Sequence, residues 1–327
     1  MKPYQACHIV ALAAMIGLSM AASVMAPPAA QTAVPRPIPE ASLITDAGWA
    51  MPVVGSRDRP AAGRRPTVEA LSRTFADLDY DLGTVIAGED DVPRLFLARL
   101  PADIDAIDAI ATRKALFVQT VLPLVLQANE EIDADRRRLW EVRYRLRMEQ
   151  RLDAVDRLWL IVTAERYGVA PDDLDALARR VDVIPTSLAL AQAVIESGWG
   201  TSRFVREGNA LFGQRTFTGS GDLVPERREE GRTHRVRVFP TLLESVRAYA
   251  FNLNTHPVYG AFRDARASMR RDGVPLDSLR LAGYLDRYAE DGQRYPKALR
   301  TLIETNDLGR FDQARLRHPG IGGAVGS

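Results

Sequence analysis

The spacing of apolar residues along the chain predicts a mainly α-helical protein. From Val68 onward, apolar side chains recur with the period of a helix, except for a pause around residues 88–93, and each segment has a broad apolar face. Such faces are typical of helices packed in a bundle. Long helices are expected over 113–129, with a kink at Pro123, and over 133–167, followed by a short helix over 172–180.

A second helical series begins after residue 184. Its first helix is expected to have Thr186 or Ser187 as its cap and to run to about Ser197, where Gly198 ends it. Further helices are predicted within 202–208, from Thr241, from Asp277 or Ser278, and from Tyr295.

One segment of this second half lacks the helical period. Over residues 214–239 glycines are frequent, and residues 233–239 alternate between apolar and polar, which predicts a small β-lobe. After it, Thr241 and Glu244 have the spacing of a capping box, so Glu244 is expected to be structural.

Composition marks the two ends of the chain. Residues 1–26 have a basic start, an apolar run and small residues, the order of a secretory signal peptide, and the run over 9–26 is nearly long enough for a membrane tether. The next segment is rich in Pro, Ala, Gly and Arg without a period. The expected organisation is a signal peptide or N-terminal anchor over 1–26, a linker over 27–66, a helical region over 67–183, a second domain over 184–308 and a flexible tail over 309–327.

Charge and cysteine content exclude several classes of function. The chain has 43 Lys and Arg residues against 42 Asp and Glu residues, so no nucleic-acid partner is expected. Its hydrophobic fraction of 46% excludes wholesale disorder. Cys7 is the only cysteine and the 4 histidines are scattered, so neither disulfides nor a Cys/His zinc cluster can form, and no metal or other cofactor is expected.

Glu196 is the candidate for acid chemistry. It is the one carboxylate on the helix predicted over 186–197, and it lies in the last turn, where the helix dipole disfavours a carboxylate by a few tenths to about 1 kcal/mol. Burial and the dipole both favour the protonated carboxyl group, which a general acid near neutral pH requires. The alternative is a surface glutamate at a helix end that simply faces water.

Two neighbouring motifs carry a resemblance to a known family. Residues 192–202, Gln-Ala-Val-Ile-Glu-Ser-Gly-Trp-Gly-Thr-Ser, and residues 208–213, Gly-Asn-Ala-Leu-Phe-Gly, resemble the catalytic signature of the glucosaminidases of glycoside hydrolase family 73. The similarity covers about 184–306 and is greatest to the Bax-like branch of Gram-negative bacteria, which residues 91–94 and 114–131 also resemble.

The resemblance implies both fold and activity. It implies a lysozyme-like helical domain with a small β-lobe, preceded by an α-helical region, in the periplasm or cell envelope. The implied partner is the glycan strand of peptidoglycan, cleaved without a cofactor at the β-1,4 bond between N-acetylglucosamine and N-acetylmuramic acid. Glu196 is the implied acid.

Further site residues follow from the resemblance. Glu230 in the β-lobe aligns with a second carboxylate, although Gly231 stands where the commoner family pattern has an aromatic residue. A solvated charge run is the alternative for Glu230. Tyr295 matches a tyrosine that lines the cleft near the acid. Since aromatic and polar groups suit a sugar site, the candidate substrate-binding residues are Gln192, Trp199, Asn209 and Phe212.

Two other functions are alternatives at this point. A lytic transglycosylase also uses a glutamate at a helix end, but such enzymes usually continue with Gly-Leu-Met-Gln, whereas residues 211–214 are Leu-Phe-Gly-Gln. A non-catalytic wall-binding or assembly factor could use the helical region over 68–170 as a docking module. The sequence leaves the oligomeric state and the stereochemistry of cleavage open.

Overall fold

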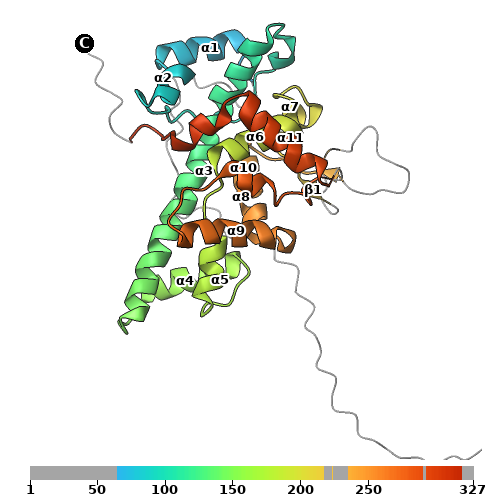
Figure 1. Ribbon diagram of the computed structural model, residues 1–327. Helices are drawn as coiled ribbons and strands as arrows, with labels where there is room; N and C mark the ends of the chain where they lie inside the picture. Colours follow the sequence, from blue (N-terminus) through green and yellow to red (C-terminus); the bar gives the residue numbers. More distant parts are fainter. Residues whose placement is uncertain (1–64, 217–222, 224–234, 290–291, 319–327) are drawn as a thin grey trace, which may run out of the picture. The chain divides into compact units, whose positions relative to one another are not determined.

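A computed structural model gives the arrangement of these elements. It describes residues 65–216, 223, 235–289 and 292–318 (Figure 1). The chain divides into two units, Met1–Met51 and Pro52–Ser327, and every described residue belongs to the second. The expected signal peptide or tether, the linker up to residue 64 and the chain beyond residue 318 lie outside the described residues.

Helices are the main elements of residues 65–183. The elements are α1 (Val68–Asp77), α2 (Leu82–Ala87), the short 3-10 helix η1 (Ile104–Ala106), α3 (Ile110–Arg147), α4 (Ala154–Arg166) and α5 (Leu174–Arg180). Helix α1 starts where the pattern predicts, with the Thr67 side chain accepting a hydrogen bond from the Ala70 N–H. The expected pause after α2 is also present, because Gly88 ends that helix in the left-handed conformation.

The boundary between the two long helices was predicted in the wrong place. Helix α3 continues through Pro123 and past residue 129 to Arg147, and the break falls before α4, over residues 148–153. No glycine or proline occurs between 129 and 133, so nothing local interrupts the backbone hydrogen bonds there. The real break has Glu149 in the left-handed region and Asp153 as the side-chain cap of α4.

The second half adds shorter helices and one small sheet. Its elements are α6 (Thr186–Ser197), α7 (Arg203–Gly208), β1 (Arg215–Thr216), β2 (Arg235–Val236), α8 (Leu242–Thr255), η2 (Pro257–Tyr259), α9 (Gly260–Arg271), α10 (Ser278–Ala282), α11 (Arg294–Thr305) and η3 (Leu308–Gln313). Strands β1 and β2 are antiparallel, with Arg215 opposite Val236. The mainly α fold with a small β element is therefore confirmed.

Helix α9 is an element that the apolar pattern did not predict. Its buried face includes Arg263 and Arg266, and the Arg266 side chain is completely buried. The Arg266 guanidinium donates to the carbonyls of Asp182, Val183 and Arg179 and to Asn254 Oδ1. Burial lowers the pKa of Arg266 to about 10, and the charge of Asp182 opposes that shift. The two arginines interrupt the apolar stripe of Phe262, Ala265 and Met269 on this inner face.

The buried residues form two hydrophobic cores. The main core combines residues of α1, α2 and the first part of α3 with residues of α6, α8, α9, α10 and α11. A smaller second core joins the end of α3 to α4 and α5. Helix α3 contributes to both, as its course in Figure 1 shows. Residues on both sides of 184 thus share one core, and the boundary expected there does not separate two packed bodies.

The end of the chain is also packed further than predicted. The flexible tail was expected to start at residue 309, but η3 continues to Gln313, and Phe311 and Leu316 are buried. Leu316 pairs with Val92 in an isolated β-bridge, and Arg317 donates to the Leu78 carbonyl. These contacts join the end of the described chain to its beginning.

Candidate active site

Helix α6 is the buried element that carries Glu196. All of its residues from Thr186 to Val194 are buried, in contact with α3, α10, α11 and η3. Its start differs from the prediction, because neither Thr186 nor Ser187 caps it. Instead Asp312 of η3 accepts hydrogen bonds from the Ser187 N–H and hydroxyl, each at 2.8 Å. The cap thus comes from a residue far away in sequence.

The other end of α6 matches the prediction. Gly198 follows Ser197 in the left-handed conformation and ends the helix. The Ser197 hydroxyl donates to the Ala193 carbonyl and accepts from the Gly200 N–H, which fixes the turn that leaves the helix. Glu196 lies in this last turn and is partly exposed, although most of its helix is buried. A carboxylate is therefore presented at the edge of the main core.

A directed chain of hydrogen bonds leads to Glu196. The Tyr249 hydroxyl donates to Gln192 Oε1 at 2.7 Å, and Gln192 Nε2 donates to the Tyr295 oxygen at 3.0 Å. The Tyr295 hydroxyl in turn donates to Glu196 Oε1 at 2.9 Å. The chain links α8, α6 and α11, which lie far apart in the sequence. Each hydroxyl has one proton, so the direction of every donation is fixed.

Tyrosine rings surround this chain. Tyr288 stacks on Tyr295 with a centroid distance of 5.3 Å, and Phe212 stacks on Tyr249 at 3.8 Å. Burial, and then the negative charge of Glu196, raise the pKa of Tyr295 far above its usual value. Burial likewise raises the pKa of Tyr249 and Tyr288 well above 10, and that of Tyr259 to about 12. These hydroxyl groups stay protonated and remain donors.

Gly213 lies directly against the other oxygen of Glu196. It has a φ of +57°, and a Cβ atom built on it would lie 3.1 Å from Glu196 Oε2. Any side chain here would therefore both strain the backbone and crowd the carboxylate. The glycine leaves Oε2 beside backbone, while Oε1 faces Tyr295.

The turn before Gly213 is built from two of the predicted substrate-binding residues. Asn209 ends α7 with a φ of +53°, and its Nδ2 donates to the carbonyls of Phe239 and Pro240. The buried Phe212 ring stacks on Tyr249, and its carbonyl accepts from the Tyr288 hydroxyl at 3.2 Å. Gln192, Asn209 and Phe212 are at most 3% exposed. The contacts described for these three side chains are with other residues of the protein.

Trp199 follows Gly198 and also has a positive φ, of +59°. Its ring meets the edge of Phe117 on α3 at a centroid distance of 5.8 Å, and Lys114 Nζ lies 4.9 Å from its centroid. The Lys114 ammonium group also donates to Asn306 Oδ1. The partly buried Trp199 therefore joins the end of α6 to α3.

The β-lobe is described only in part. Leu223 pairs with Val236 beside the two strands, and Val238 and Leu223 both lie against Gly208 of α7. The lobe is thus attached to the element that precedes the Gly213 turn. Glu230, the predicted second carboxylate, and its neighbour Glu226 lie outside the described residues.

The upstream segment that resembles the Bax-like branch holds this frame together. Asn129 on α3 forms two hydrogen bonds with the backbone of Ile184, just before α6. Glu130 pairs with Arg94, and Glu131 pairs with Arg247 of α8. The sequence motif singled out the segment that contains these residues but predicted no structural role for them. Asn129 and Glu131 thus position α3 against the start of α6 and against α8, and Glu130 holds the segment that follows α2.

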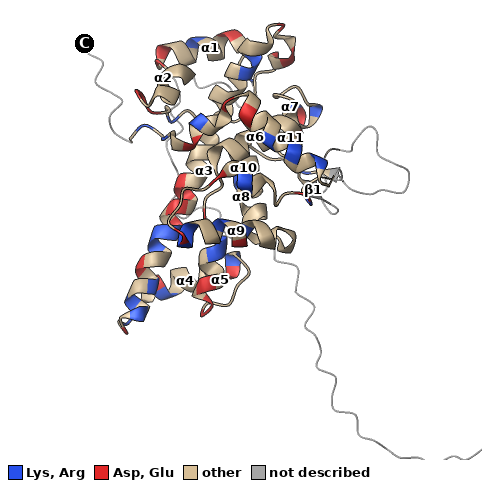
Figure 2. Cartoon of the chain, viewed as in Figure 1, with Lys and Arg blue, Asp and Glu red and all other residues tan. Residues whose placement is uncertain are grey.

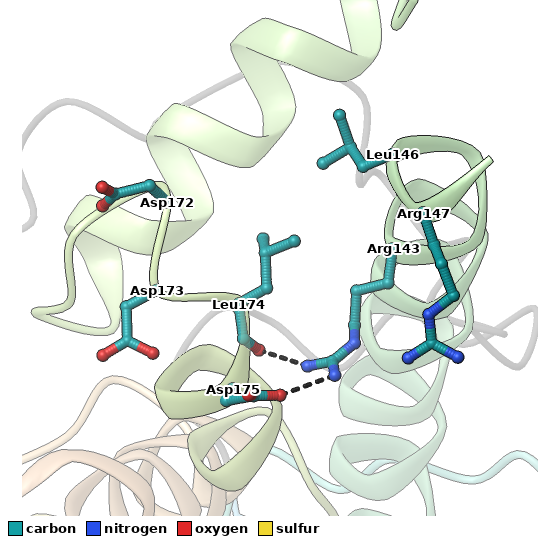
Figure 3. Close-up of a pocket in the computed structure, with 7 residues that line it drawn as sticks. All are labelled: Arg143, Leu146, Arg147, Asp172, Asp173, Leu174 and Asp175. Atoms are coloured by element: carbon teal, nitrogen blue, oxygen red, sulfur yellow. Dashed lines mark hydrogen bonds and ion pairs between the residues drawn. The ribbon is translucent and has the colours of Figure 1, made fainter. Parts of the chain in front are cut away.

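A separate pocket lies in the second core region, away from Glu196. Figure 3 shows its lining, which consists of Arg143, Leu146, Arg147, Asp172, Asp173, Leu174 and Asp175. Arg143 donates to the Leu174 carbonyl and to Asp175, so its charge already has partners. Within the described residues, no cluster of His, Cys, Asp and Glu could hold a metal ion, and no helix is long and apolar enough to cross a membrane.

Comparison with known proteins supports the resemblance. The family model named Glucosaminidase, described as mannosyl-glycoprotein endo-beta-N-acetylglucosaminidase, matches residues 171–308. Protein bax of Escherichia coli (strain K12) is 33% identical over 200 residues, which cover 59% of this chain and 70% of that protein. The chain belongs to the glucosaminidase family, in its Bax-like branch. The predicted family is thereby confirmed.

A solved structure is similar to part of this chain. It is the catalytic domain of the autolysin Auto from Listeria monocytogenes, 19% identical, with a TM-score of 0.31, covering 52% of this chain and 96% of that one. No feature of the site described above rests on that overlap. The matched range 171–308 includes Glu196, Gly213, Tyr249 and Tyr295, so the hydrogen-bond chain lies within the glucosaminidase region.

Proposed function

We propose that this Bax-like glucosaminidase hydrolyses the glycan strand of peptidoglycan at the β-1,4 bond between N-acetylglucosamine and N-acetylmuramic acid, outside the cytoplasm. Family membership supports a glycoside hydrolase in general. The observation that carries the specific proposal is the setting of Glu196, a partly exposed carboxyl group with a buried hydroxyl donating to one oxygen and a glycine beside the other.

Glu196 acts as the general acid. Because Gln192 donates to the Tyr295 oxygen, the only proton of that hydroxyl points at Glu196 Oε1. Oε1 is therefore an acceptor, and the proton for the leaving glycosidic oxygen sits on Oε2, the oxygen beside Gly213. The absence of a side chain at Gly213 gives a sugar oxygen room to approach.

The other candidate residues support this acid. Tyr295 touches Glu196, while Gln192 and Tyr249 act through Tyr295 as positioning residues. Since Asn209 and Phe212 are buried, we assign them to the turn that places Gly213. Trp199 fixes the end of α6 against α3 and has part of its surface left for a sugar.

Glu230 is our candidate for the second carboxylate. It acts as a base on water, as a nucleophile, or beside a substrate whose own 2-acetamido group assists, and each route is known among glycosidases. The anomeric configuration of the first product separates inversion from retention.

Digestion of purified sacculi tests the proposal. Glutamine keeps the shape of Glu196 but cannot donate a proton to the leaving group, so Glu196→Gln is expected to lose at least about 100-fold in rate while its thermal unfolding is unchanged. Glu244→Gln is the control, since Glu244 pairs with Arg247. Near-normal turnover by the Glu196 variant contradicts the assignment. Products with anhydro-muramyl ends would identify a transglycosylase instead, and an inactive wild-type chain that binds sacculi would identify a wall-binding factor.

A further inference from the structure

The outer face of α4 is apolar although it faces solvent. Val155, Leu158, Ile161 and Val162 are 68%, 62%, 49% and 45% exposed. At 100° per residue these four side chains lie within an arc of about 120°. The opposite face of α4, with Leu160 and Ala164, is buried in the second core. Helix α4 is therefore apolar on two sides, whereas a surface helix normally has a polar outer face.

This face is displayed by a firmly fixed helix. Arg138 and Arg145 of α3 both bind Asp156 at the inner edge of α4, at 2.9 and 2.7 Å. On the other side of the second core, Arg143 ties α3 to α5 through the Leu174 carbonyl and Asp175 (Figure 3). Arg166, at the end of α4, also pairs with Asp135 of α3, and none of these ion pairs involves the four exposed apolar side chains.

Two charged residues of α4 fit a second copy of the same helix, Glu165 within the arc and Arg157 about 40° outside it. Arg157 lies near the start of α4 and Glu165 near its end, eight residues or about 12 Å apart. In the described part of the chain, neither side chain is in an ion pair, and both residues are exposed. A two-fold axis perpendicular to α4 reverses the helix direction, so Arg157 of each copy would lie alongside Glu165 of the other. A parallel arrangement would place like charges together.

The surrounding charges favour a protein partner over a lipid surface. Figure 2 shows residues of both signs interspersed along α3, α4 and α5. A helix that binds an anionic membrane normally has its apolar face bordered by basic residues. Arg157 and Arg166 do border the arc of α4, but Glu165 lies within it and Arg166 already pairs with Asp135, so a self-complementary contact fits better.

We infer that the outer face of α4 is a self-association surface, on which α4 of a second copy packs antiparallel with paired Arg157 and Glu165 contacts. This inference is independent of the proposed hydrolase activity. The contact consists of one helix pair and is small, so the dimer is expected to be weak and in exchange with monomer.

Sedimentation equilibrium of the full chain tests this surface. Wild type is expected to show a reversible monomer–dimer equilibrium, and Leu158→Glu is expected to weaken it at least about 10-fold, because a charge replaces apolar surface that the dimer buries. Val274→Glu is the matched control, since Val274 is 45% exposed and lies outside α4. A monomeric wild type, or equal dissociation constants for the Leu158 and Val274 variants, overturns the inference.

A charge exchange tests the antiparallel geometry separately. Arg157→Glu and Glu165→Arg should each weaken the dimer, and the double variant should restore it, since both charges are only reversed. If the double variant does not regain the wild-type dissociation constant, the paired contacts are overturned, even if Leu158→Glu weakens the dimer as expected. Flotation of a monomeric wild type with anionic vesicles would also overturn self-association and assign the face to lipid. Circular dichroism checks that every variant retains its helices.

Discussion

Two oxygens of one carboxyl group have different surroundings in this protein. Glu196 Oε1 accepts from Tyr295 at 2.9 Å, and Oε2 faces Gly213. The burial that raises the pKa of Tyr295 keeps its hydroxyl protonated over the working pH range, so it cannot become a second anion beside Glu196. This asymmetry is the residue-scale basis of the proposed acid.

Tyr295→Phe removes the donor to Glu196 and also the oxygen that accepts from Gln192 Nε2. A hydrogen bond to a charged group contributes about 1.5–3 kcal/mol, so kcat is expected to fall by about 10-fold or more with little change in KM. Steady-state kinetics on a soluble glycan fragment measures both. Tyr284→Phe is the control, because Tyr284 is 37% exposed. Equal kcat values for the two variants would show that Tyr295 does not position the acid.

Gly213→Ala tests the space beside Oε2. The new methyl group would lie 3.1 Å from Glu196 Oε2 and would also force alanine into a positive φ. Gly273→Ala imposes a similar strain at a φ of +66° where a Cβ atom has no neighbour within 4 Å. Both variants should lose about 1 kcal/mol of stability, but only Gly213→Ala should lose most of its activity. Retained activity in Gly213→Ala would mean that Oε2 does not need this space.

At the scale of elements, the start of α6 depends on another helix. Asp312 of η3 accepts from the Ser187 N–H and hydroxyl, and Ser278 of α10 adds a weaker donor at 3.4 Å. Asp312→Ala leaves the Ser187 N–H without this acceptor, while the Ser187 and Ser278 hydroxyls keep each other as partners at 2.7 Å. The loss should cost about 1–3 kcal/mol of unfolding free energy. Urea unfolding measures this loss of stability. Glu304→Ala is the control, because Glu304 is exposed. Equal stability of the two variants would mean that Asp312 is not the cap.

Because the Asp312 carboxyl group titrates, the stability of the protein is expected to depend on pH. Burial raises the pKa of Asp312, against the lowering effect of its Ser187 hydrogen bonds. A carboxyl group whose pKa is raised by folding stabilises the folded protein while it is protonated. This stabilisation is fully present below the pKa of the unfolded state, about 4, and is lost as the pH rises through the pKa of the folded state. The stability difference between wild type and Asp312→Ala should therefore be larger at pH 3 than at pH 7. A stability difference between the two proteins that is larger at pH 7 than at pH 3 would contradict this prediction.

For the whole molecule, α3 is the element that both cores share. Its first part packs in the main core with α6, and its end packs with α4 and α5. The region matched by the family model, 171–308, lacks α3 and also η3 beyond Leu308. The glucosaminidase region alone would therefore expose a large part of the main core to water.

A fragment covering 171–308 is accordingly expected to show no cooperative thermal transition, whereas a fragment covering 65–318 should unfold cooperatively. Removing the apolar partners of a core costs several kcal/mol for each large side chain, more than a domain of this size can lose. Calorimetry on both fragments measures this. A cooperative transition in the shorter fragment would show that the glucosaminidase region folds without α3.

Local features of the sequence determined most of the helices and the position of Glu196. Apolar spacing predicted α1, α5, α8 and α11, and Gly198 predicted the end of α6, because helix period and a left-handed cap are properties of neighbouring residues. The motif around Glu196 also predicted the family, which the comparisons confirm. Glu230 stays a prediction, since it lies outside the described residues.

Only the tertiary structure decided what depends on distant partners. Helix α9 is stable with Arg266 inside because carbonyls of 179–183 and Asn254 receive its guanidinium, and α6 is capped by a residue of η3. The orientation of Glu196 depends on Tyr295 and Gly213, which α11 and a turn bring to it. A buried charge or an unpaired N–H is costly without its partner, and no local pattern identifies a partner about 100 residues away.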